Sequence, residues 1–345
     1  GINHLLPAAE ECGVRHFSVF SADEAVLALK ASTAYSTIMI MGMITNEQLE
    51  WAIEHEVECY IFEVDRLKAA VKLAKKRKKR ARIHLQIETG MNRTGLERKD
   101  LAQTVSIINA NREHLILSGI CTHYAGAESV GNYVRIQNQI QKFHLISRWF
   151  RRKEVRPALR HTACSAAMLN YPETIMDMVR VGIAHYGFWP NRETYMNVLK
   201  KNKSFKDIKD PLKRVITWKS EVMNIKEVVA GDFIGYGSTY LANRNMTIAT
   251  VPVGYKHGFK RDLTNKGLVL IKGERAQVVG LVNMNMITVD VTDIEGVQKG
   301  DEVIIIGEQG GQTITVASFS EISENLNYEV LTRLPSELPR LIVEK

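Results

Sequence analysis

Two tyrosines in the second half of the chain lie between closely spaced glycines, in an arrangement that could support proton transfer. Tyr236 lies in the sequence Ile-Gly-Tyr-Gly-Ser, and Tyr255 lies in Val-Gly-Tyr-Lys-His-Gly. Glycine allows tight turns, so each phenol could be held at a fixed position, as an acid/base group requires. The local pattern by itself favours a simpler interpretation, a pair of hairpins whose tyrosines only pack. The chemical interpretation therefore depends on residues elsewhere in the chain.

The first half of the chain carries side chains suited to an anionic or planar ligand. Arg93 lies in a loop bounded by glycines, where a guanidinium could bind an anionic oxygen. Ser165 opens a short helix, whose first N–H groups could bind a phosphate. Arg180 and Gly182 add a further guanidinium and a further glycine at an expected strand end. His123 ends a strand and could stack on a flat cofactor, although a lone histidine at such a place is more often structural.

The segments that would position these residues alternate between short apolar strands and amphipathic helices. Strands are expected at 16–20, 37–41, 58–62, 82–88, 115–123, 157–161 and 178–184, and helices at 22–31, 46–55, 65–79, 99–111 and 132–150, with a short one after Ser165. Ser21 is expected to cap the first of these helices. Repeated strand–helix units predict an α/β fold of the (β/α)8 barrel type, in which active-site residues gather at strand ends. An open doubly wound sheet is the competing architecture, but no glycine-rich dinucleotide turn follows any of these strands.

The composition changes after Gly187. Residues 191–213 are polar and rich in lysine, which is typical of a connector or a surface insertion. From Val215 onward, short β-type runs alternate with glycine turns, which predicts a β domain of barrel or sandwich type. We therefore expect a barrel domain at residues 1–205 and a predominantly β domain at residues 206–345.

The bulk composition is typical of a soluble globular protein with two domains. The chain has 345 residues, of which 45% are hydrophobic and 24% are charged. No apolar run approaches the roughly 20 residues of a membrane span, and the first residues carry no signal-peptide pattern, so we expect a cytoplasmic protein with no membrane partner. The four cysteines are far apart, which favours reduced thiols over a metal site or a disulfide framework.

A run of six basic residues, 75–80, contributes much of the net charge of +8. Such a run could bind nucleic acid or an anionic membrane. A solvated helix end is favoured, because cations at a helix C-terminus interact well with the helix dipole and no aromatic residues interleave with the run. We therefore expect no nucleic-acid partner.

Taken in order along the chain, these residues and the two tyrosine motifs resemble alanine racemase, the fold-type III family that uses pyridoxal 5'-phosphate (PLP). The resemblance extends from Gly1 to the end of the chain. It implies a barrel that carries PLP, a C-terminal β domain, and a homodimer in which each active site borrows residues from the partner. The implied activity is the interconversion of L- and D-alanine, which supplies D-alanine for peptidoglycan.

The resemblance also assigns roles to individual residues. Arg180 would bond to the pyridine nitrogen of PLP, and because arginine keeps its proton, that nitrogen would stay unprotonated. His123 would lie against the cofactor ring, and Arg93 would contact its phenolic oxygen and the substrate. The phosphate would be held by Ser165, Gly182 and Ile183. The substrate site would be shaped by Tyr255 and Met284, both contributed by the partner.

The implied mechanism uses two bases. A racemase removes the α-proton from one face of the substrate and returns one to the other face, so it needs a base on each side. Tyr236 of the partner subunit would serve one face, and a PLP-linked lysine would serve the other. An ordinary tyrosine has a pKa near 10, and His161 and Arg180 would form a hydrogen-bonded chain behind it, where positive charge favours the phenolate.

The largest departure from the family pattern concerns that lysine. In the family it lies in a Lys-Ala-Asn-Ala-Tyr-Gly type of motif, and the chain begins at a residue, Gly1, that matches the last glycine of the motif. Lys30, the first lysine of the chain, falls in a helix and does not match. We expect that roughly 35 to 45 residues precede Gly1, since seven strands leave one strand of a barrel unfilled.

Smaller departures affect the expected specificity more than the expected cofactor. Gln86 stands where many members have a carbamylated lysine that orients the arginine, so Arg93 must be oriented in another way. Other departures are Cys164 beside the phosphate serine, Asn283 and Asn285 around Met284, and Ser336 in place of a tyrosine. The alternatives are therefore a racemase of serine, lysine or broader specificity, and a PLP-binding protein without catalysis. A decarboxylase of the same architecture is disfavoured by the short substrate site that the resemblance implies.

Overall fold

The computed structural model describes residues 1–201, 210–316, 318 and 327–343, and the chain forms two compact units. The α/β unit comprises Gly1–Ala184 and the segment that starts at Trp189, whereas the β unit comprises His185–Phe188 and the chain from Asp210 onward. The boundary expected between residues 205 and 206 lies outside the described residues. Because His185–Phe188 groups with the later part of the chain, the chain passes between the two units more than once.

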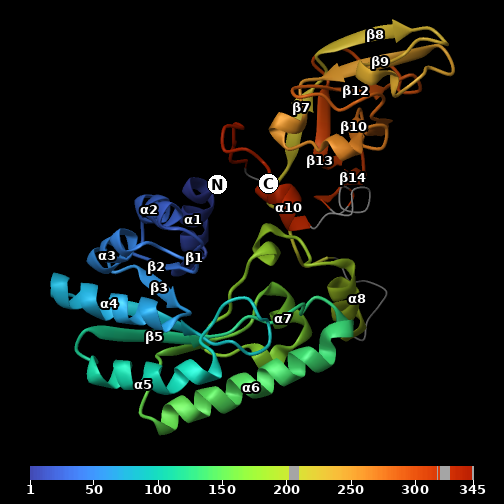
Figure 1. Cartoon of the computed structure of the whole chain (residues 1–345). Helices are drawn as coiled ribbons and strands as arrows, with labels where there is room; N and C mark the ends of the chain where they lie inside the picture. Colours follow the sequence, from blue (N-terminus) through green and yellow to red (C-terminus); the bar gives the residue numbers. More distant parts are fainter. Residues whose placement is uncertain (202–209, 317, 319–326, 344–345) are drawn as a thin grey trace. The chain divides into compact units, whose positions relative to one another are not determined.

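Parallel strands form the sheet of the α/β unit, in the same order as in the sequence (Figure 1). They are β1 (His16–Val19), β2 (Thr37–Ile40), β3 (Glu58–Ile61), β4 (Ala81–Gln86), β5 (Leu115–Cys121) and β6 (Leu159–His161). Successive βα units of a barrel produce this sequential order, whereas a doubly wound sheet reverses its strand order at a switch point. The strand order confirms the prediction of a barrel-type α/β fold.

The α/β unit also contains helices, some of which begin at a capping side chain. They are α1 (Ile2–Glu11), α2 (Ala22–Ala31), α3 (Asn46–Glu54), α4 (Val64–Arg77), α5 (Leu101–Ala110), α6 (Tyr133–Arg152), α7 (Ser165–Asn170) and α8 (Arg192–Lys201). The side chains of Ser21 and Thr45 each accept a hydrogen bond of 3.2 Å from the backbone of the third helical residue, which completes a capping box in α2 and in α3. The predicted cap at Ser21 is confirmed.

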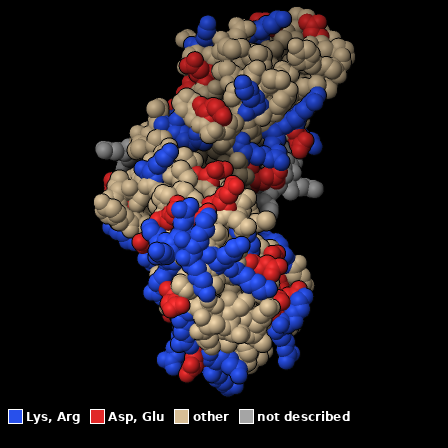
Figure 2. Space-filling view, turned by 60° about the vertical axis from the view of Figure 1, so that its left-hand side comes forward, with Lys and Arg blue, Asp and Glu red and all other residues tan. Residues whose placement is uncertain are grey.

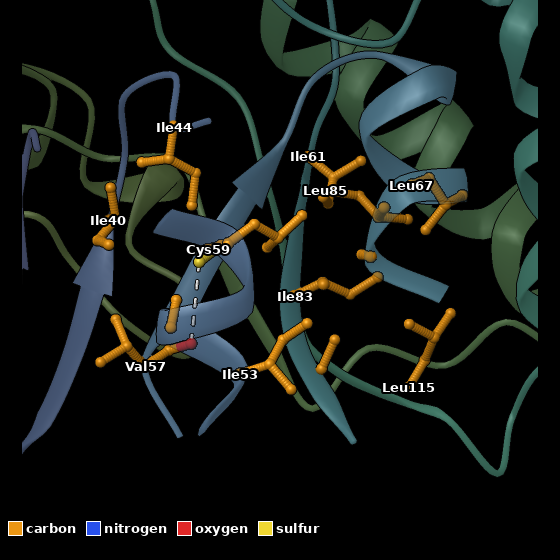
Figure 3. Close-up of a cluster of buried hydrophobic side chains, with 14 of the residues drawn as sticks. Ile40, Ile44, Ile53, Val57, Cys59, Ile61, Leu67, Ile83, Leu85 and Leu115 are labelled. Carbon is orange, nitrogen blue, oxygen red and sulfur yellow. Dashed lines mark hydrogen bonds between the residues drawn. The ribbon is translucent and has the colours of Figure 1, made fainter. Parts of the chain in front are cut away.

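The strands separate apolar from polar side chains by simple alternation. In β4, Ile83 and Leu85 belong to the apolar core between the sheet and its helices, and Figure 3 shows them beside Leu67 of α4. His84 and Gln86 alternate with them and lie on the opposite face of the sheet. Burial of each large aliphatic side chain contributes about 1.5 to 3 kcal/mol. The helix-facing side therefore holds the sheet together, and the other face is free to carry polar groups.

The strand predicted at residues 178–184 was wrong. Residues 178–184 do not form a strand; an isolated bridge joins Cys164 to Arg180, and a short 3-10 helix, Ile183–Tyr186, follows. Just before this segment, the Asp177 carboxylate accepts from both the backbone and the guanidinium of Arg160, and the backbone N–H of Asp177 donates to the main-chain oxygen of Arg160. The connector expected at 191–213 contains α8, because the side chain of Asn191 accepts from the backbone N–H of Thr194 and caps that helix.

The β unit consists of antiparallel strands and confirms the prediction of a β domain. Its strands are β7 (Trp218–Glu221), β8 (Asn224–Val228), β9 (Met246–Val251), β10 (Leu268–Ile271), β11 (Glu274–Gln277), β12 (Ile287–Asp290), β13 (Glu302–Gln309) and β14 (Gln312–Ile314), with helix α10 (Asn327–Thr332) after them. One sheet has the order β11-β10-β13-β14 with β7 also paired to β13, and the other has the order β12-β9-β8. The run expected to be β-rich from 276 to 291 is divided by a loop between β11 and β12. That loop takes part in the site described below.

Lysine and arginine side chains gather in one large group on the face shown in Figure 2. The basic run predicted at a helix end begins in the last turn of α4, which contains Lys75, Lys76 and Arg77. Lys76 and Arg77 both contact the Glu50 carboxylate of α3, at 2.6 and 2.8 Å, so part of this charge is neutralised within the unit. Among the described residues, no helix is long and apolar enough to cross a membrane.

Candidate active site

Arg180 is fixed beside the carboxyl ends of β5 and β6 by four hydrogen bonds. Its Nη1 donates to Nδ1 and to the main-chain oxygen of His161, both at 2.7 Å. Its Nη2 donates to the main-chain oxygens of Thr122 and Thr162, at 2.8 and 3.2 Å. A guanidinium carries five N–H groups, so among the described residues only its Nε–H is left without an acceptor. One donor of a fixed and permanent cation is therefore available to a ligand atom.

His161 is the side-chain partner of Arg180, and the structure keeps it neutral. The imidazole is fully buried at the end of β6. Burial and the neighbouring Arg180 cation hold the pKa of His161 far below its ordinary value. Because a guanidinium can only donate, Nδ1 of His161 is the acceptor and carries no proton. The predicted pairing of His161 with Arg180 is thus present in the structure.

Ser165, Gly182 and Ile183, predicted to hold a phosphate, lie next to one another. The Ser165 hydroxyl accepts a hydrogen bond of 2.9 Å from the backbone N–H of Gly182. Ile183, the residue after Gly182, is buried at the start of the 3-10 helix. Since the Ser165 oxygen acts as an acceptor here, its own O–H is left to donate to an anion. The arrangement suits a small anionic group at this point of the strand ends.

His123 follows β5 and lies in a positively charged environment. Burial, together with the cations of Arg180 and Arg93, lowers the pKa of His123 to about 4. The imidazole is therefore neutral near pH 7. A site in which two guanidinium groups act on one histidine favours a ligand that carries negative charge.

The loop after β4 presents Arg93 to solvent, and neighbouring residues shape that loop. The carboxylate of Glu88 accepts hydrogen bonds from the backbone N–H groups of Gly90 and Asn92. Gln86, one of the residues expected to depart from the family pattern, bonds to the hydroxyl of Thr94 at 3.1 Å. Gln86 therefore orients the residue next to Arg93 rather than the guanidinium itself.

The remaining predicted residues, Tyr236, Tyr255 and Met284, line a single cavity of about 400 Å³ in the β unit. The other lining residues are Arg261, Leu281, Val282, Asn283, Asn285 and Met286. Tyr236 is 74% exposed and Tyr255 is 45% exposed, so both phenols are open to solvent in this chain. Most of the cavity wall comes from the loop between β11 and β12.

Glycines decide how these tyrosines are presented. Gly235 and Gly237 have φ of 77° and 71°, in the left-handed region that favours glycine, so the turn around Tyr236 depends on both. At Gly254 a Cβ would lie 2.2 Å from the main-chain oxygen of Asn283. The backbone N–H of Tyr255 donates to that same oxygen at 3.0 Å. The close approach fixes Tyr255 against the loop that carries Met284.

The predicted residues thus form two groups, one in each unit, and sequence reasoning missed part of each group. Arg261 adds a cation to the cavity of the β unit, and its only signal was a basic residue six positions after Tyr255. His84 and Glu58 extend the hydrogen bonds of His161 on the inner face of the sheet. In the sequence, each of these two residues was marked only as a polar residue inside an otherwise apolar strand.

Comparison with known proteins agrees with this arrangement. Residues 1–190 match the family described as "Alanine racemase, N-terminal domain", and residues 215–342 match "Alanine racemase, C-terminal domain". Alanine racemase 1 of Caldanaerobacter subterraneus subsp. tengcongensis is 34% identical over 99% of this chain and 84% of its own length. The alanine racemase of Leptospira interrogans is 33% identical over 100% of this chain and 86% of its own length.

The same family appears among solved structures. The alanine racemase of Streptomyces lavendulae superposes with a TM-score of 0.91 at 26% identity, over 100% of this chain and 87% of its own. The alanine racemase of Clostridium difficile gives a TM-score of 0.85 at 28% identity, over 97% and 83%. The chain belongs to the alanine racemase family of PLP-dependent isomerases.

Proposed function

We propose that the protein interconverts L- and D-alanine with PLP bound at the strand ends of the α/β unit. The observation that carries the proposal is the setting of Arg180, whose Nη groups are committed to four acceptors while Nε–H stays available. A pyridine nitrogen that accepts from this group stays unprotonated, because arginine retains its proton in proteins. The relative from Bacillus anthracis, 27% identical, was solved with bound L-Ala-P, which supports an alanine-sized substrate.

The residues of the α/β unit fit this cofactor by their chemistry. When bound, PLP supplies an electron sink for the electron pair released as the Cα–H bond of the amino acid breaks. Ser165, Gly182 and Ile183 would hold the phosphate, and neutral His123 would lie against the ring. Arg93, in its exposed loop, would bind the phenolic oxygen of the cofactor and orient the substrate carboxylate.

We assign proton transfer at Cα to Tyr236, which is supplied by a second copy of the chain. The phenol is exposed beside a cavity formed with Tyr255 and Met284, as expected for a group that completes a site on another subunit. A site built from Arg180 of one chain and Tyr236 of another requires a homodimer. In the cytoplasm, such an enzyme would supply D-alanine for peptidoglycan.

The activity is tested by incubating the purified protein with PLP and L-alanine and measuring D-alanine with a D-amino-acid oxidase. General acid/base catalysis contributes about 10²- to 10⁴-fold, so Tyr236→Phe should lower kcat/KM by that factor. Tyr240→Phe, in the same glycine-rich segment but packed on an apolar cluster, is the matched control. No D-alanine from the wild type, or equal rates for the two variants, would contradict the proposal. Parallel assays with L-serine and L-lysine test whether Asn283 and Asn285 broaden the specificity.

The shared site is tested by mixing two inactive variants, Arg180→Ala and Tyr236→Phe. In a mixed dimer, one site receives both intact residues and the other receives neither. Random exchange makes half of the dimers mixed, so about one quarter of wild-type activity should return for an isologous dimer. Proven subunit exchange without any recovery of activity would exclude a site shared between chains.

A further inference from the structure

A continuous chain of hydrogen bonds runs from Arg180 into the inner face of the sheet. From His161 Nε2 to His84 Nδ1 the distance is 2.8 Å, and from His84 Nε2 to Glu58 Oε2 it is also 2.8 Å. His16 Nε2 reaches the same Glu58 oxygen at 2.9 Å. We call this chain of Arg180, His161, His84, Glu58 and His16 the relay. Its members come from β1, β3, β4, β6 and the segment after β6.

The position of every proton between Arg180 and Glu58 follows from the two ends of the relay. Arg180 can only donate, so Nδ1 of His161 accepts and its Nε2 carries the proton. The Nε2–H group of His161 donates a hydrogen bond to Nδ1 of His84, so Nδ1 of His84 carries no proton. The one ring N–H of His84 is therefore at Nε2. The Glu58 carboxylate can only accept, and it accepts from that group. The donor end and the acceptor end therefore require the same tautomer of both imidazoles.

The charge of Glu58 is stabilised by its partners. Its side chain is buried at the start of β3, which by itself would raise the pKa of the carboxyl group. Hydrogen bonds from His16 and His84, with a further one from Ser118, hold the pKa well below its ordinary value instead. The relay therefore joins a buried carboxylate to the guanidinium of Arg180 through two neutral imidazoles.

A metal site is the competing interpretation of the same residues. One potential ligand atom from each of His16, Glu58 and His84 lies within 4.8 Å of the others. To bind a metal through Nε2, His84 would have to carry its proton on Nδ1 and donate it to His161. His161 would then carry its proton on Nδ1 and place an N–H group against the Arg180 guanidinium at 2.7 Å. Two donors facing each other at that distance repel, so the relay excludes the metal site.

A glycine and a bulge in β5 leave room for the imidazoles of the relay. A Cβ on Gly119 would lie 2.2 Å from Nδ1 of His84 and 3.1 Å from Nε2 of His161, so only glycine leaves room for the bond between them. The pairing of β4 with β5 also shifts register here, from Ile83 opposite Leu117 to His84 opposite Gly119. The extra residue, Ser118, forms a bulge, and bulges re-aim side chains at functional sites. Ser118 is also the hydroxyl that bonds to Glu58.

We infer that Glu58 and His84 are positioning residues, which hold His161 as an acceptor toward Arg180 and so hold the guanidinium in place for the cofactor. The purpose of holding Arg180 rests on the proposed function. The direction of the relay does not, because it follows from the hydrogen bonds alone. The two parts can therefore be tested separately.

The direction is tested on cofactor-free protein labelled with ¹⁵N-histidine. The pyrrole-type and pyridine-type nitrogens of an imidazole differ in ¹⁵N shift, and single His→Gln variants assign the signals. His161 and His84 should both be neutral with the proton on Nε2, and added zinc should leave the signals of His16 and His84 unchanged. A proton on Nδ1 of either residue, or zinc binding that moves these signals, would overturn the relay, whether or not the protein racemises alanine.

The positioning role is tested by PLP affinity, measured by titrating cofactor-free variants. Residues that orient a ligand-binding group from behind typically contribute about 10- to 100-fold, so Gly119→Ala and Glu58→Leu should weaken PLP binding by that factor. Gly131→Ala, where a Cβ meets only ordinary contact, and Glu10→Gln, which alters another buried carboxylate of the same unit, are the controls.

Should Gly119→Ala fail to fold, Glu58→Gln keeps an oxygen acceptor for His84, removes the charge and replaces the second oxygen by an NH2 group. Its PLP affinity should fall between those of the wild type and Glu58→Leu. The positioning role is wrong if folded Glu58→Leu binds PLP as tightly as Glu10→Gln does.

Discussion

Acid should destabilise the α/β unit in part through His123, because this residue resists protonation in the folded state. Burial, together with the cations of Arg180 and Arg93, lowers its pKa to about 4 from the ordinary histidine value of 6.5. Below pH 6.5 the unfolded chain therefore binds a proton that the folded chain does not. The stability of the folded state falls as the pH is lowered from 6.5 toward 4, and above 6.5 the effect is absent.

The size of the effect follows from the two pKa values. A shift of one unit corresponds to about 1.4 kcal/mol, and between pH 7 and pH 4.5 the full shift would remove about 2.4 kcal/mol. His123 is partly exposed, and solvent screening reduces such effects, so we expect a loss of about 1 to 2 kcal/mol. The His123→Gln variant cannot take up this proton. From pH 7 to pH 4.5 it should therefore lose about 1 to 2 kcal/mol less unfolding free energy than the wild type.

The assay is native-state hydrogen exchange of cofactor-free protein in urea, corrected for the pH dependence of intrinsic exchange. Amides of β5 report on the α/β unit, and amides of β10 report on the β unit as an internal control. The difference in unfolding free energy between wild type and His123→Gln should change by about 1 to 2 kcal/mol from pH 7 to pH 4.5 in β5 and stay constant in β10. Parallel pH dependences of the two proteins in β5 would refute the reasoning.

Further predictions concern substrate presentation, acid stability and the core. Gly254→Ala should lower kcat/KM for alanine by about 100-fold without loss of β-unit structure, since the new Cβ pushes Tyr255 off its loop; unchanged kinetics would show that the close approach is unimportant. Burial opposes ionisation of Glu10, but hydrogen bonds from Ser32 and its neighbours lower its pKa to about 2, so its contribution to stability is complete above pH 4.5 and is lost as the pH falls toward 2. Glu10→Gln should therefore flatten the acid limb of unfolding curves, and a parallel limb would contradict this. Phe143→Ala should cost about 3 to 5 kcal/mol in urea unfolding, because the ring is fully buried; a loss below 1 kcal/mol would mean that the site collapses around the cavity.

Local patterns in the sequence were sufficient to predict the positions of most helices and strands. The cap at Ser21 and the hydrophobic pattern after it locate α2 at the expected residues. By contrast, the 178–184 segment contains strand-forming residues, but its backbone pairs only through an isolated bridge at Arg180, whose N–H donates to the main-chain oxygen of Ala163. Whether a strand forms there depends on tertiary contacts that local propensity does not contain.

The candidate site was predictable where family motifs mark single residues, as at Arg180 and Tyr236. The relay was not predictable, because Glu58 and His84 are 26 residues apart and His84 and His161 are 77 apart. The residues next to Gly119 in the sequence give no indication that two imidazole rings pack against this glycine. Such contacts arise only when the parallel strands bring their inner faces together.

The interleaved path of the chain limits how the protein can be divided for experiment. His185–Phe188 belongs to the β unit, yet α8 follows it in sequence and belongs to the α/β unit. Gly187 packs so closely on Lys213 that a Cβ would lie 2.0 Å from its main-chain oxygen, and the backbone of Val215 donates to Tyr186. A single cut within residues 191–213 would therefore separate the β unit from His185–Phe188. The segment that leads into β7, including Lys213 and Val215, packs on these residues. Expression of the β unit with this packing intact would therefore require a chain that joins His185–Phe188 to the segment that starts at Asp210.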